Sequence, residues 1–430
     1  MNMKIQSMLS IAMMAAVALT TVSCSDDNSG GNDNNGGNDK YSDKSYGQNA
    51  INACNTLVIG LESANTKIAS ASLNEAQRTY LKSVLSNLVD NVIVPTYTKL
   101  ADDTEDLEET LNGLDANNIT QADIDKACDL FKKARKNWEQ SEAFLGGAAS
   151  DFDIDPTIDS WPLNRSLLLN YFNSGSMNED MLDDASILGF HALEFILFRN
   201  GQPRQVAEFR SNDTYKGFTN ISGAKELLYA QQVCKLLKER TFQLQVAWEG
   251  ETGSNADRVQ VMKNAGLQYM TNKNLSFGEN LKKAGETVST FTSLKDAIAQ
   301  VLSDDEGSAA AIGNEVGTAK IANPFSAGYI FYVESPYSYN SISDFQDNIR
   351  SIRNVWYGTT TGSADSNVPS FYNFFNNTNQ SATSTSVVNL FNDAINKIGN
   401  IPAPFVKYCS TIWNLPYEDD GRTTDEFPEE

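Results

Sequence analysis

Residues 187–198 read Ile-Leu-Gly-Phe-His-Ala-Leu-Glu-Phe-Ile-Leu-Phe, an apolar run that only His191 and Glu194 interrupt with ionisable side chains. These two residues are three positions apart, so a helix places them on one face. A helix that is apolar on all its other sides is buried in a protein core. The stretch therefore predicts a buried helix.

Glu194 needs a compensating partner in such a helix. Burying a carboxylate without partners costs several kcal/mol, so an arginine, a set of hydrogen-bond donors or a metal ion must satisfy it. Gly189 has no side chain and lets another backbone or a ligand come close. The motif also fits a simpler interpretation, in which His191 is a satisfied core histidine and Glu194 a structural carboxylate.

Apolar residues at helical spacing continue along most of the chain, while alternation at period two is rare. The sequence therefore predicts an all-α fold, with strand-like material limited to residues 328–333. The Gly/Ser/Asn-rich stretch at 250–255 indicates a boundary between an N-terminal helical bundle (45–250) and a C-terminal helical bundle (251–430), although a long loop inside one body fits equally well. Predicted helices cover residues 45–66, 74–112 with a break near Pro95, 120–145, 180–199, 224–248, 258–302, 341–357 and 385–414.

Two further carboxylates lie along the helix predicted from residue 120. Thr120 is a good N-cap, with Asp123 three residues later. Glu142 continues the apolar stripe of this helix, and Glu139 lies one turn earlier at the edge of the stripe, so both point inward or toward a seam. The stripe consists of Cys128, Phe131, Ala134 and Trp138.

An acidic tract at residues 151–159 follows and superficially resembles a calcium loop. It fails that test, because Pro156 stands where an EF-hand needs glycine and Pro162 where it needs a bidentate glutamate. A capped, solvated turn is the better interpretation of the first two aspartates of this tract. Asp155 and Asp159 remain as candidates for a position near the other carboxylates.

The overall charge excludes some classes of function. Among 430 residues, 33 are lysine or arginine and 55 are aspartate or glutamate, so the formal net charge is -22. Nucleic acid is a poor partner for this acidic field, and cations are better ones. His191 is the only histidine of the chain, which excludes a zinc site with two histidines.

The N-terminal segment is predicted to be a lipoprotein signal peptide (residues 1–23), because a short basic start and an apolar run end in small residues before Cys24. Cys24 would then carry the lipid anchor, and an Asn/Gly-rich tether would extend to residue 44. An ordinary secretory signal is the alternative. This segment predicts an outer-membrane lipoprotein of the cell envelope, facing the periplasm or the surface, and no later segment is apolar enough to span a membrane.

Four cysteines remain after the signal, at widely spaced positions and without a Cys-x-x-Cys pair. We expect buried thiols in helices, although one disulfide would be possible in an oxidising envelope. The four are Cys54, Cys128, Cys234 and Cys409.

Three blocks of this sequence together resemble the imelysin family. Residues 189–194 match its GxHxxE signature, and residues 138–144 with 153–163 resemble the approach to it. Residues 334–358 look like its motif in the second half of the chain. The resemblance implies an all-helical envelope protein of two bundle-like domains, linked to iron uptake, with a site where the halves meet.

From this resemblance we expect a metal site and a ligand site. The expected metal ligands, carried over from periplasmic relatives in iron transport, are His191, Glu194, Glu139, Glu142 and Asp159. Oxygen-rich sets with one nitrogen suit iron or manganese better than a closed zinc site, and iron is the expected metal. The other residues expected to contact a ligand are Gly189, Ser141, Glu334, Ser338, Asp344 and Asn348. Binding through His191 is expected to weaken below a pH of roughly 6.5, the ordinary histidine pKa.

The segment at 334–358 has a second interpretation. Ser338, Ser341, Asp344 and Asn348 recur at spacings of three and four residues, which line one helix face and fit a site. A hydrated helix capped by Ser341 or Ser343 fits the same spacing, because Asp344 would then favour the positive helix start.

Three functions follow as hypotheses. The first is binding of iron or an iron-bearing ligand for bacterial iron uptake, with iron transport components as partners. The second is a metal-dependent peptidase, against which the sequence speaks because residue 195, where an inverted HxxEH motif needs histidine, is Phe. The third is a surface binding module for a polysaccharide or a host protein.

Overall fold

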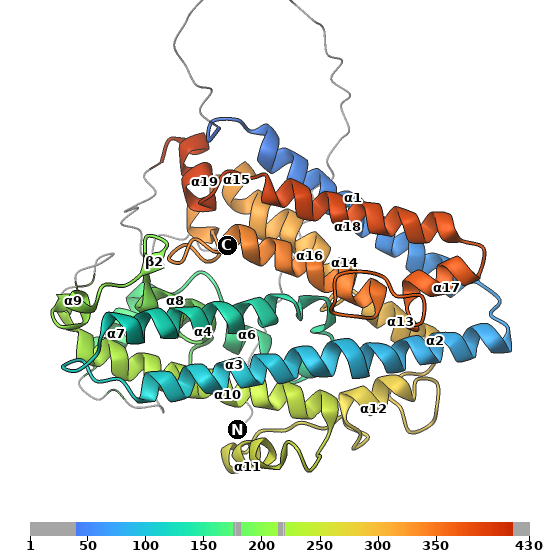
Figure 1. Ribbon diagram of the computed structural model, residues 1–430, viewed down its shortest axis with the longest axis horizontal. Coiled ribbons are helices and arrows are strands. Elements are labelled where there is room, and N and C mark those ends of the chain that lie inside the picture. Colours follow the sequence, from blue (N-terminus) through green and yellow to red (C-terminus); the bar gives the residue numbers. More distant parts are fainter. Residues whose placement is uncertain (1–39, 175–176, 178–181, 214–217, 219, 416–430) are drawn as a thin grey trace, which may run out of the picture. The chain divides into compact units, whose positions relative to one another are not determined.

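The computed structural model describes residues 40–174, 177, 182–213, 218 and 220–415. These residues form helices joined by loops (Figure 1). The predicted signal peptide, Cys24 and the tether as far as residue 39 lie outside the described residues.

Helices make up nearly all regular structure of the described residues, which confirms the all-α prediction. In the first half they are α1 Ser45–Ser70, α2 Glu75–Leu88, α3 Val94–Asn112, α4 Gln121–Glu139, α5 Ala148–Asp151, α6 Asp155–Asp159, α7 Arg165–Asn173, α8 Gly189–Leu197, α9 Val206–Phe209 and α10 Gly223–Glu249. In the second half they are α11 Ala256–Ala265, α12 Phe277–Lys282, α13 Leu294–Leu302, α14 Ala309–Glu315, α15 Asn323–Ser326, α16 Ser341–Tyr357, α17 Phe371–Asn377, α18 Ser381–Gly399 and α19 Phe405–Trp413.

Short irregular elements complete the fold. π-helical turns cover Val89–Ile93 and Val316–Ala322, and 3₁₀ turns cover Glu142–Phe144, Ala185–Ile187 and Ile330–Tyr332. Two antiparallel pairs of two-residue strands follow α8, namely β1 Phe198–Arg199 with β2 Gln202–Pro203 and β3 Asn212–Asp213 with β4 Ile221–Ser222.

Local chemistry accounts for several helix boundaries that the sequence predicted. Thr120 caps α4 in a reciprocal capping box with Asp123, as expected. The predicted break near Pro95 appears as the π-helical turn at Val89–Ile93, after which Pro95 occupies the first turn of α3, where its missing N–H costs little.

Other predicted boundaries are wrong. The helix expected at 258–302 is three helices, because Gly266 ends α11 in a left-handed conformation and serine caps at 276 and 293 start α12 and α13. The helix expected at 385–414 divides into α18 and α19 around Pro404. The strand expected at 328–333 is instead a 3₁₀ turn that follows Gly328.

The helix expected from residue 180 begins at Gly189 as α8, and all nine of its residues are buried. It packs against α4, α6 and α10, while α3 packs against both α4 and α10 (Figure 1). The prediction that this apolar stretch forms a buried helix is confirmed.

Helices that are far apart in the sequence also pack together. The first helix, α1, packs against α14 and α18, and α16 contacts both α4 and the turn Glu142–Phe144. The contact of α16 with α4 brings residues of the two predicted halves together. The boundary at 250–255 stays a prediction.

Two further features bear on the sequence predictions. None of the described helices is long and apolar enough to cross a membrane. The four cysteines at 54, 128, 234 and 409 are buried free thiols, as expected.

Candidate functional site

Arg135 lies at the centre of a group of buried ionised side chains. Its guanidinium Nη1 contacts the carboxylate of Asp159, and Nη2 lies 2.5 Å from Oε1 of both Glu139 and Glu334. Its Nε lies 3.6 Å from Oδ2 of Asp344. One cation therefore joins carboxylates from α4, α6, the loop before α16 and α16 itself. We call these residues, together with Glu142, His191, Glu194 and Lys320, the central cluster.

The sequence analysis missed Arg135, although a signal was present. Residues 128, 131, 135, 138 and 142 follow one another at spacings of three and four, so Arg135 belongs to the same stripe as Trp138. The side chain of Arg135 is completely buried.

His191 lies between two carboxylates. Its Nε2 is 3.1 Å from Oδ1 of Asp159, and its Nδ1 is 3.2 Å from Oε2 of Glu194. Glu334 is farther away, with Oε1 at 4.0 Å from Nε2. Among the described residues, Nε2 has no well-directed hydrogen bond.

Gly189 sets the position of His191 relative to Asp159. Its φ is +70°, and a Cβ at this position would lie 1.9 Å from the carbonyl oxygen of Ile158. Only glycine permits this close approach of α8 to α6. Gly189 therefore lets the backbone of α6 come close to α8. This is one of the two roles expected of it, the other being the approach of a ligand.

Glu194 is satisfied by hydrogen-bond donors from the second half of the chain. Its Oε1 accepts from the backbone N–H of Tyr337 at 3.1 Å and from the backbone N–H and hydroxyl of Ser338, both at 2.7 Å. Its Oε2 faces the imidazole of His191. A set of donors is thus what compensates this buried carboxylate.

The polar face of α16 points into the central cluster. This agrees with the first interpretation of residues 334–358, in which these side chains face a site. Asp344 and Asn348 are buried, and Asn348 Nδ2 donates to Oε2 of Glu139 at 2.5 Å. The hydrated, serine-capped helix is the wrong interpretation, because the N-cap residue is Asn340 without a side-chain cap. The hydroxyl of Ser341 instead donates to the carbonyl of Glu334 at 2.5 Å.

Lys320 is a second buried cation that the sequence did not reveal. Its ammonium lies 2.9 and 3.0 Å from the two carboxylate oxygens of Glu334, and 3.9 Å from Oε1 of Glu142. No periodicity or motif around residue 320 indicated this position. Ser141 does not extend the cluster, since its hydroxyl donates to the carbonyl of Trp138 at 2.7 Å.

The central cluster contains more acidic than basic groups. Among the described residues, its buried carboxylates number six and its permanent cations are Arg135 and Lys320, with His191 as a third cation when protonated. The carboxylates are Glu139, Glu142, Asp159, Glu194, Glu334 and Asp344. At least three negative charges would be uncompensated if every carboxylate were ionised.

Proton binding partly relieves this excess. Burial raises the pKa of Glu139 and Glu142 well above the ordinary range, against the opposing effect of Arg135 and Lys320 respectively. Burial likewise raises the pKa of Asp344 to about 7. Burial alone would lower the pKa of His191, but its contacts with Asp159 and Glu194 raise it to about 9.

Donor atoms in the central cluster converge on two overlapping positions. Asp159, His191 and Glu334 each offer one ligand atom within 4.8 Å of the others, and Glu139, Glu142 and Asp159 form a second such group. Asp159 belongs to both. The structure therefore brings Asp159, not the equally plausible Asp155, beside His191.

These features define an all-α protein with a buried, acid-rich site made by both halves of the chain. A family model described as Imelysin matches residues 93–421, more than half of the chain, and the chain belongs to the imelysin family.

Relatives of this chain carry names that refer to iron. Iron-regulated protein A of Synechococcus elongatus is 30% identical over 145 residues, which are 34% of this chain and 39% of that protein. The chain thus matches about two fifths of the length of this curated relative.

Two solved structures are similar. A protein described as an iron-regulated protein A precursor, from Parabacteroides distasonis ATCC 8503, is 26% identical, with a TM-score of 0.65 over 82% of this chain and 93% of that one. An imelysin-like protein from Psychrobacter arcticum 273-4 has a TM-score of 0.44 at 10% identity, over 81% of this chain and 98% of that one.

Proposed function

We propose that this protein binds iron, or an iron-bearing ligand, in the central cluster and serves bacterial iron uptake. The observation that carries the proposal is the excess of buried carboxylates over cations, next to a histidine nitrogen without a well-directed hydrogen bond. A bound cation would supply the missing positive charge in a place where water cannot. The iron-regulated names of relatives support the choice of metal.

The donor set fits iron chemically. Asp159, Glu334 and Nε2 of His191 would hold the ion, with Glu139 and Glu142 as further oxygen donors. Carboxylates with a single imidazole suit iron or manganese better than zinc. Because Arg135 contacts Asp159, Glu139 and Glu334, iron binding requires the guanidinium to give up at least one of these contacts.

Glu194 takes a positioning role in this proposal instead of binding the metal. Its Oε1 is already occupied by the donors of Tyr337 and Ser338, and Oε2 holds Nδ1 of His191. A carboxylate on one ring nitrogen of histidine orients the other nitrogen toward a metal. Ser338 would act one step farther away, by holding Glu194.

The location in the cell belongs to the same proposal. Cys24 would attach the protein to the outer membrane through a lipid, and the tether would let the folded part reach transport components of the envelope. The lipid anchor and the tether are inferred from the sequence alone. Residues 1–39 lie outside the described part of the chain.

The peptidase alternative has less support. A zinc peptidase of the HExxH type needs two histidines on one helix, and this chain has one. Peptide turnover that disappears in Glu194→Ala would favour the peptidase.

The test is metal binding by isothermal titration calorimetry, with ferrous iron under anaerobic conditions and with manganese and zinc as competitors. We expect binding of iron that is lost in Asp159→Asn and His191→Gln. The matched control is Glu226→Gln, which removes another buried carboxylate outside the central cluster. Equal affinity of the wild type and the Asp159→Asn, His191→Gln double variant for iron would overturn the proposal.

A further inference from the structure

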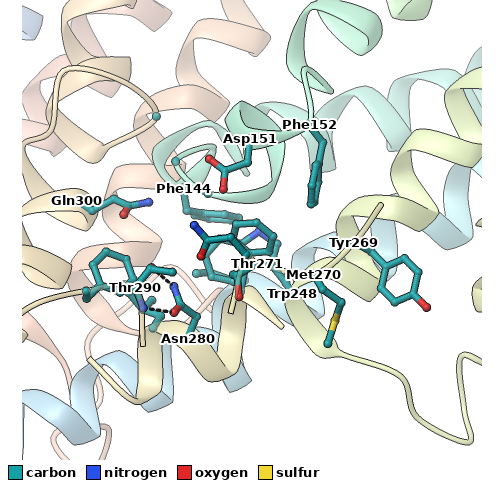
Figure 2. A pocket seen from close by; sticks show the side chains of 18 of the residues that line it. Phe144, Asp151, Phe152, Trp248, Tyr269, Met270, Thr271, Asn280, Thr290 and Gln300 are labelled. Atoms are coloured by element: carbon teal, nitrogen blue, oxygen red, sulfur yellow. Dashed lines mark hydrogen bonds between the residues drawn. The ribbon is translucent and has the colours of Figure 1, made fainter. Parts of the chain in front are cut away.

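A cavity of about 800 Å³ is lined by none of the residues of the central cluster. It is bordered by the turn Glu142–Phe144, α5, the end of α10, the loop at 266–276, α12 and α13 (Figure 2). This volume is within the range of small-molecule sites. None of the residues proposed to bind iron lines it.

Aromatic rings form much of the wall of this cavity. Phe152 meets Phe277 edge to face, with ring centroids 5.6 Å apart, and Trp248 lies against Phe277 at 6.1 Å. Each ring is thus held by another ring, so the wall is preformed. The aromatic lining residues are Phe144, Phe152, Trp248, Tyr269, Phe277 and Phe291.

Among the polar residues that line the cavity, the solvent-exposed Asp151 and the partly buried Gln300 come from different elements. Asp151 of α5 and Gln300 of α13 both point toward the same space (Figure 2). Within the described parts of the chain, neither the Asp151 carboxylate nor the Gln300 amide has a protein hydrogen-bond partner. Asn280 differs, because its amide donates to Thr290 Oγ1 at 2.7 Å and accepts from the Thr290 N–H at 2.7 Å.

The charge of the lining narrows the ligand class. No lysine, arginine or histidine is among the described residues that line the cavity, and Asp151 is its one carboxylate. An anionic ligand would face this carboxylate, inside a protein of net charge -22, without a compensating cation. A purely apolar ligand would leave the amide of the partly buried Gln300 without hydrogen bonds and would make no use of Asp151.

We propose that this cavity binds the ring of a neutral sugar. Such a ring has an apolar C–H face, which fits an aromatic wall, and a rim of hydroxyls that donate and accept hydrogen bonds. The carboxylate of Asp151 accepts from hydroxyls, while the amide of Gln300 both donates and accepts. An organic cation would use the rings and Asp151 but would leave the amide donor of Gln300 unused.

The test is calorimetric titration of the purified chain with glucose, galactose, mannose, N-acetylglucosamine and their β-1,4- and α-1,4-linked disaccharides, with choline and citrate as the cationic and anionic probes. We expect at least one neutral sugar to bind and to change the tryptophan fluorescence, since Trp248 borders the cavity. Tighter binding of a disaccharide than of its monosaccharide would indicate that the natural ligand is part of a glycan chain. Equal affinity for the two would indicate that it is a free sugar.

Variants separate a sugar site from an unspecific effect. Asp151→Asn and Gln300→Ala should each weaken sugar binding about tenfold or more, as expected for a lost hydrogen bond to a charged or well-placed polar group. Asp153→Asn is the matched control, because Asp153 is exposed nearby but does not line the cavity. Asp151→Asn should leave metal binding unchanged. No binding by any neutral sugar, preferential binding of choline or citrate, or sugar affinity that is insensitive to both variants would overturn the proposal.

Discussion

Two clusters of buried ionised side chains in this protein differ in their balance of charge. The central cluster combines six buried carboxylates with Arg135, Lys320 and His191. The second, which we call the strand cluster, pairs Arg199 and Arg204 with Asp213 and Glu226, beside the short strands that follow α8. Its cations and buried anions are equal in number.

Hydrogen bonding differs in the same way. In the strand cluster, Arg199 Nη2 lies 2.8 Å from Asp213 Oδ2, and Arg204 Nη2 lies 2.7 Å from Glu226 Oε2. None of these four side chains has a buried polar atom without a hydrogen bond among the described residues, whereas Arg135 Nε, Glu139 Oε1 and His191 Nε2 do. A balanced, saturated cluster has a structural role, while an unbalanced one has capacity for a further cation.

The largest expected effect comes from removing one arginine from either cluster. Arg135→Ala and Arg204→Ala should each lower the free energy of unfolding by about 3–5 kcal/mol, because uncompensated carboxylates remain buried. Ferrous iron or manganese should raise the melting temperature of Arg135→Ala by more than that of the wild type, whereas the rise for Arg204→Ala should equal the wild-type rise, because its central cluster is intact. Thermal unfolding with and without metal measures both, and equal rescue of the two variants would remove the distinction between the clusters.

The second prediction concerns pH. Because His191 has a pKa of about 9, metal must displace its proton at neutral pH, so affinity should fall about tenfold for each unit of pH below 9. With this pKa, binding is expected to weaken from a higher pH than the value of roughly 6.5 expected from the sequence. Without metal, the raised pKa means that His191 contributes its full stability below pH 6.5 and loses that contribution as the pH approaches 9.

Manganese titrations at pH 6, 7 and 8 measure this dependence without the hydrolysis of ferric iron. His191→Gln should flatten the profile, and a wild-type affinity that is constant over this range would exclude His191 as a metal ligand.

A smaller effect is expected from Glu194→Gln. The amide no longer fixes the imidazole as a carboxylate does, so metal affinity should fall about 10-fold to 100-fold. In the strand cluster, Glu226→Gln should leave metal affinity unchanged. Titration calorimetry compares the two variants, and an unaltered affinity of Glu194→Gln would contradict its positioning role.

The smallest effects should come from the helix caps near each cluster. Thr120→Ala uncaps α4, which carries Arg135, and Ser222→Ala uncaps α10, which carries Glu226. Each should cost about 1 kcal/mol of stability and leave metal affinity unchanged, since neither hydroxyl contacts a cluster. Urea unfolding measures the loss. A change in metal affinity for Thr120→Ala alone would show that α4 must be rigid for binding.

Sequence by itself determined the features that depend on neighbours along the chain. The spacing of apolar residues predicted an all-α fold, and the apolar run around His191 predicted a buried helix with a carboxylate that needs partners. Capping chemistry predicted the start of α4. The motif blocks indicated Asp159, His191 and Asp344 as site residues, and the structure places all three in one cluster.

Only the tertiary structure decided which of these groups meet. The donors that hold Glu194 come from residues 337 and 338, about 140 positions away, and Lys320 reaches the cluster without any sequence signal. Tertiary structure also decided the charge balance of the central cluster, because that balance depends on how many cations lie among its buried carboxylates. Periodicity reports which face of a helix is buried, but only the packing of helices from distant parts of the chain determines what that face contacts.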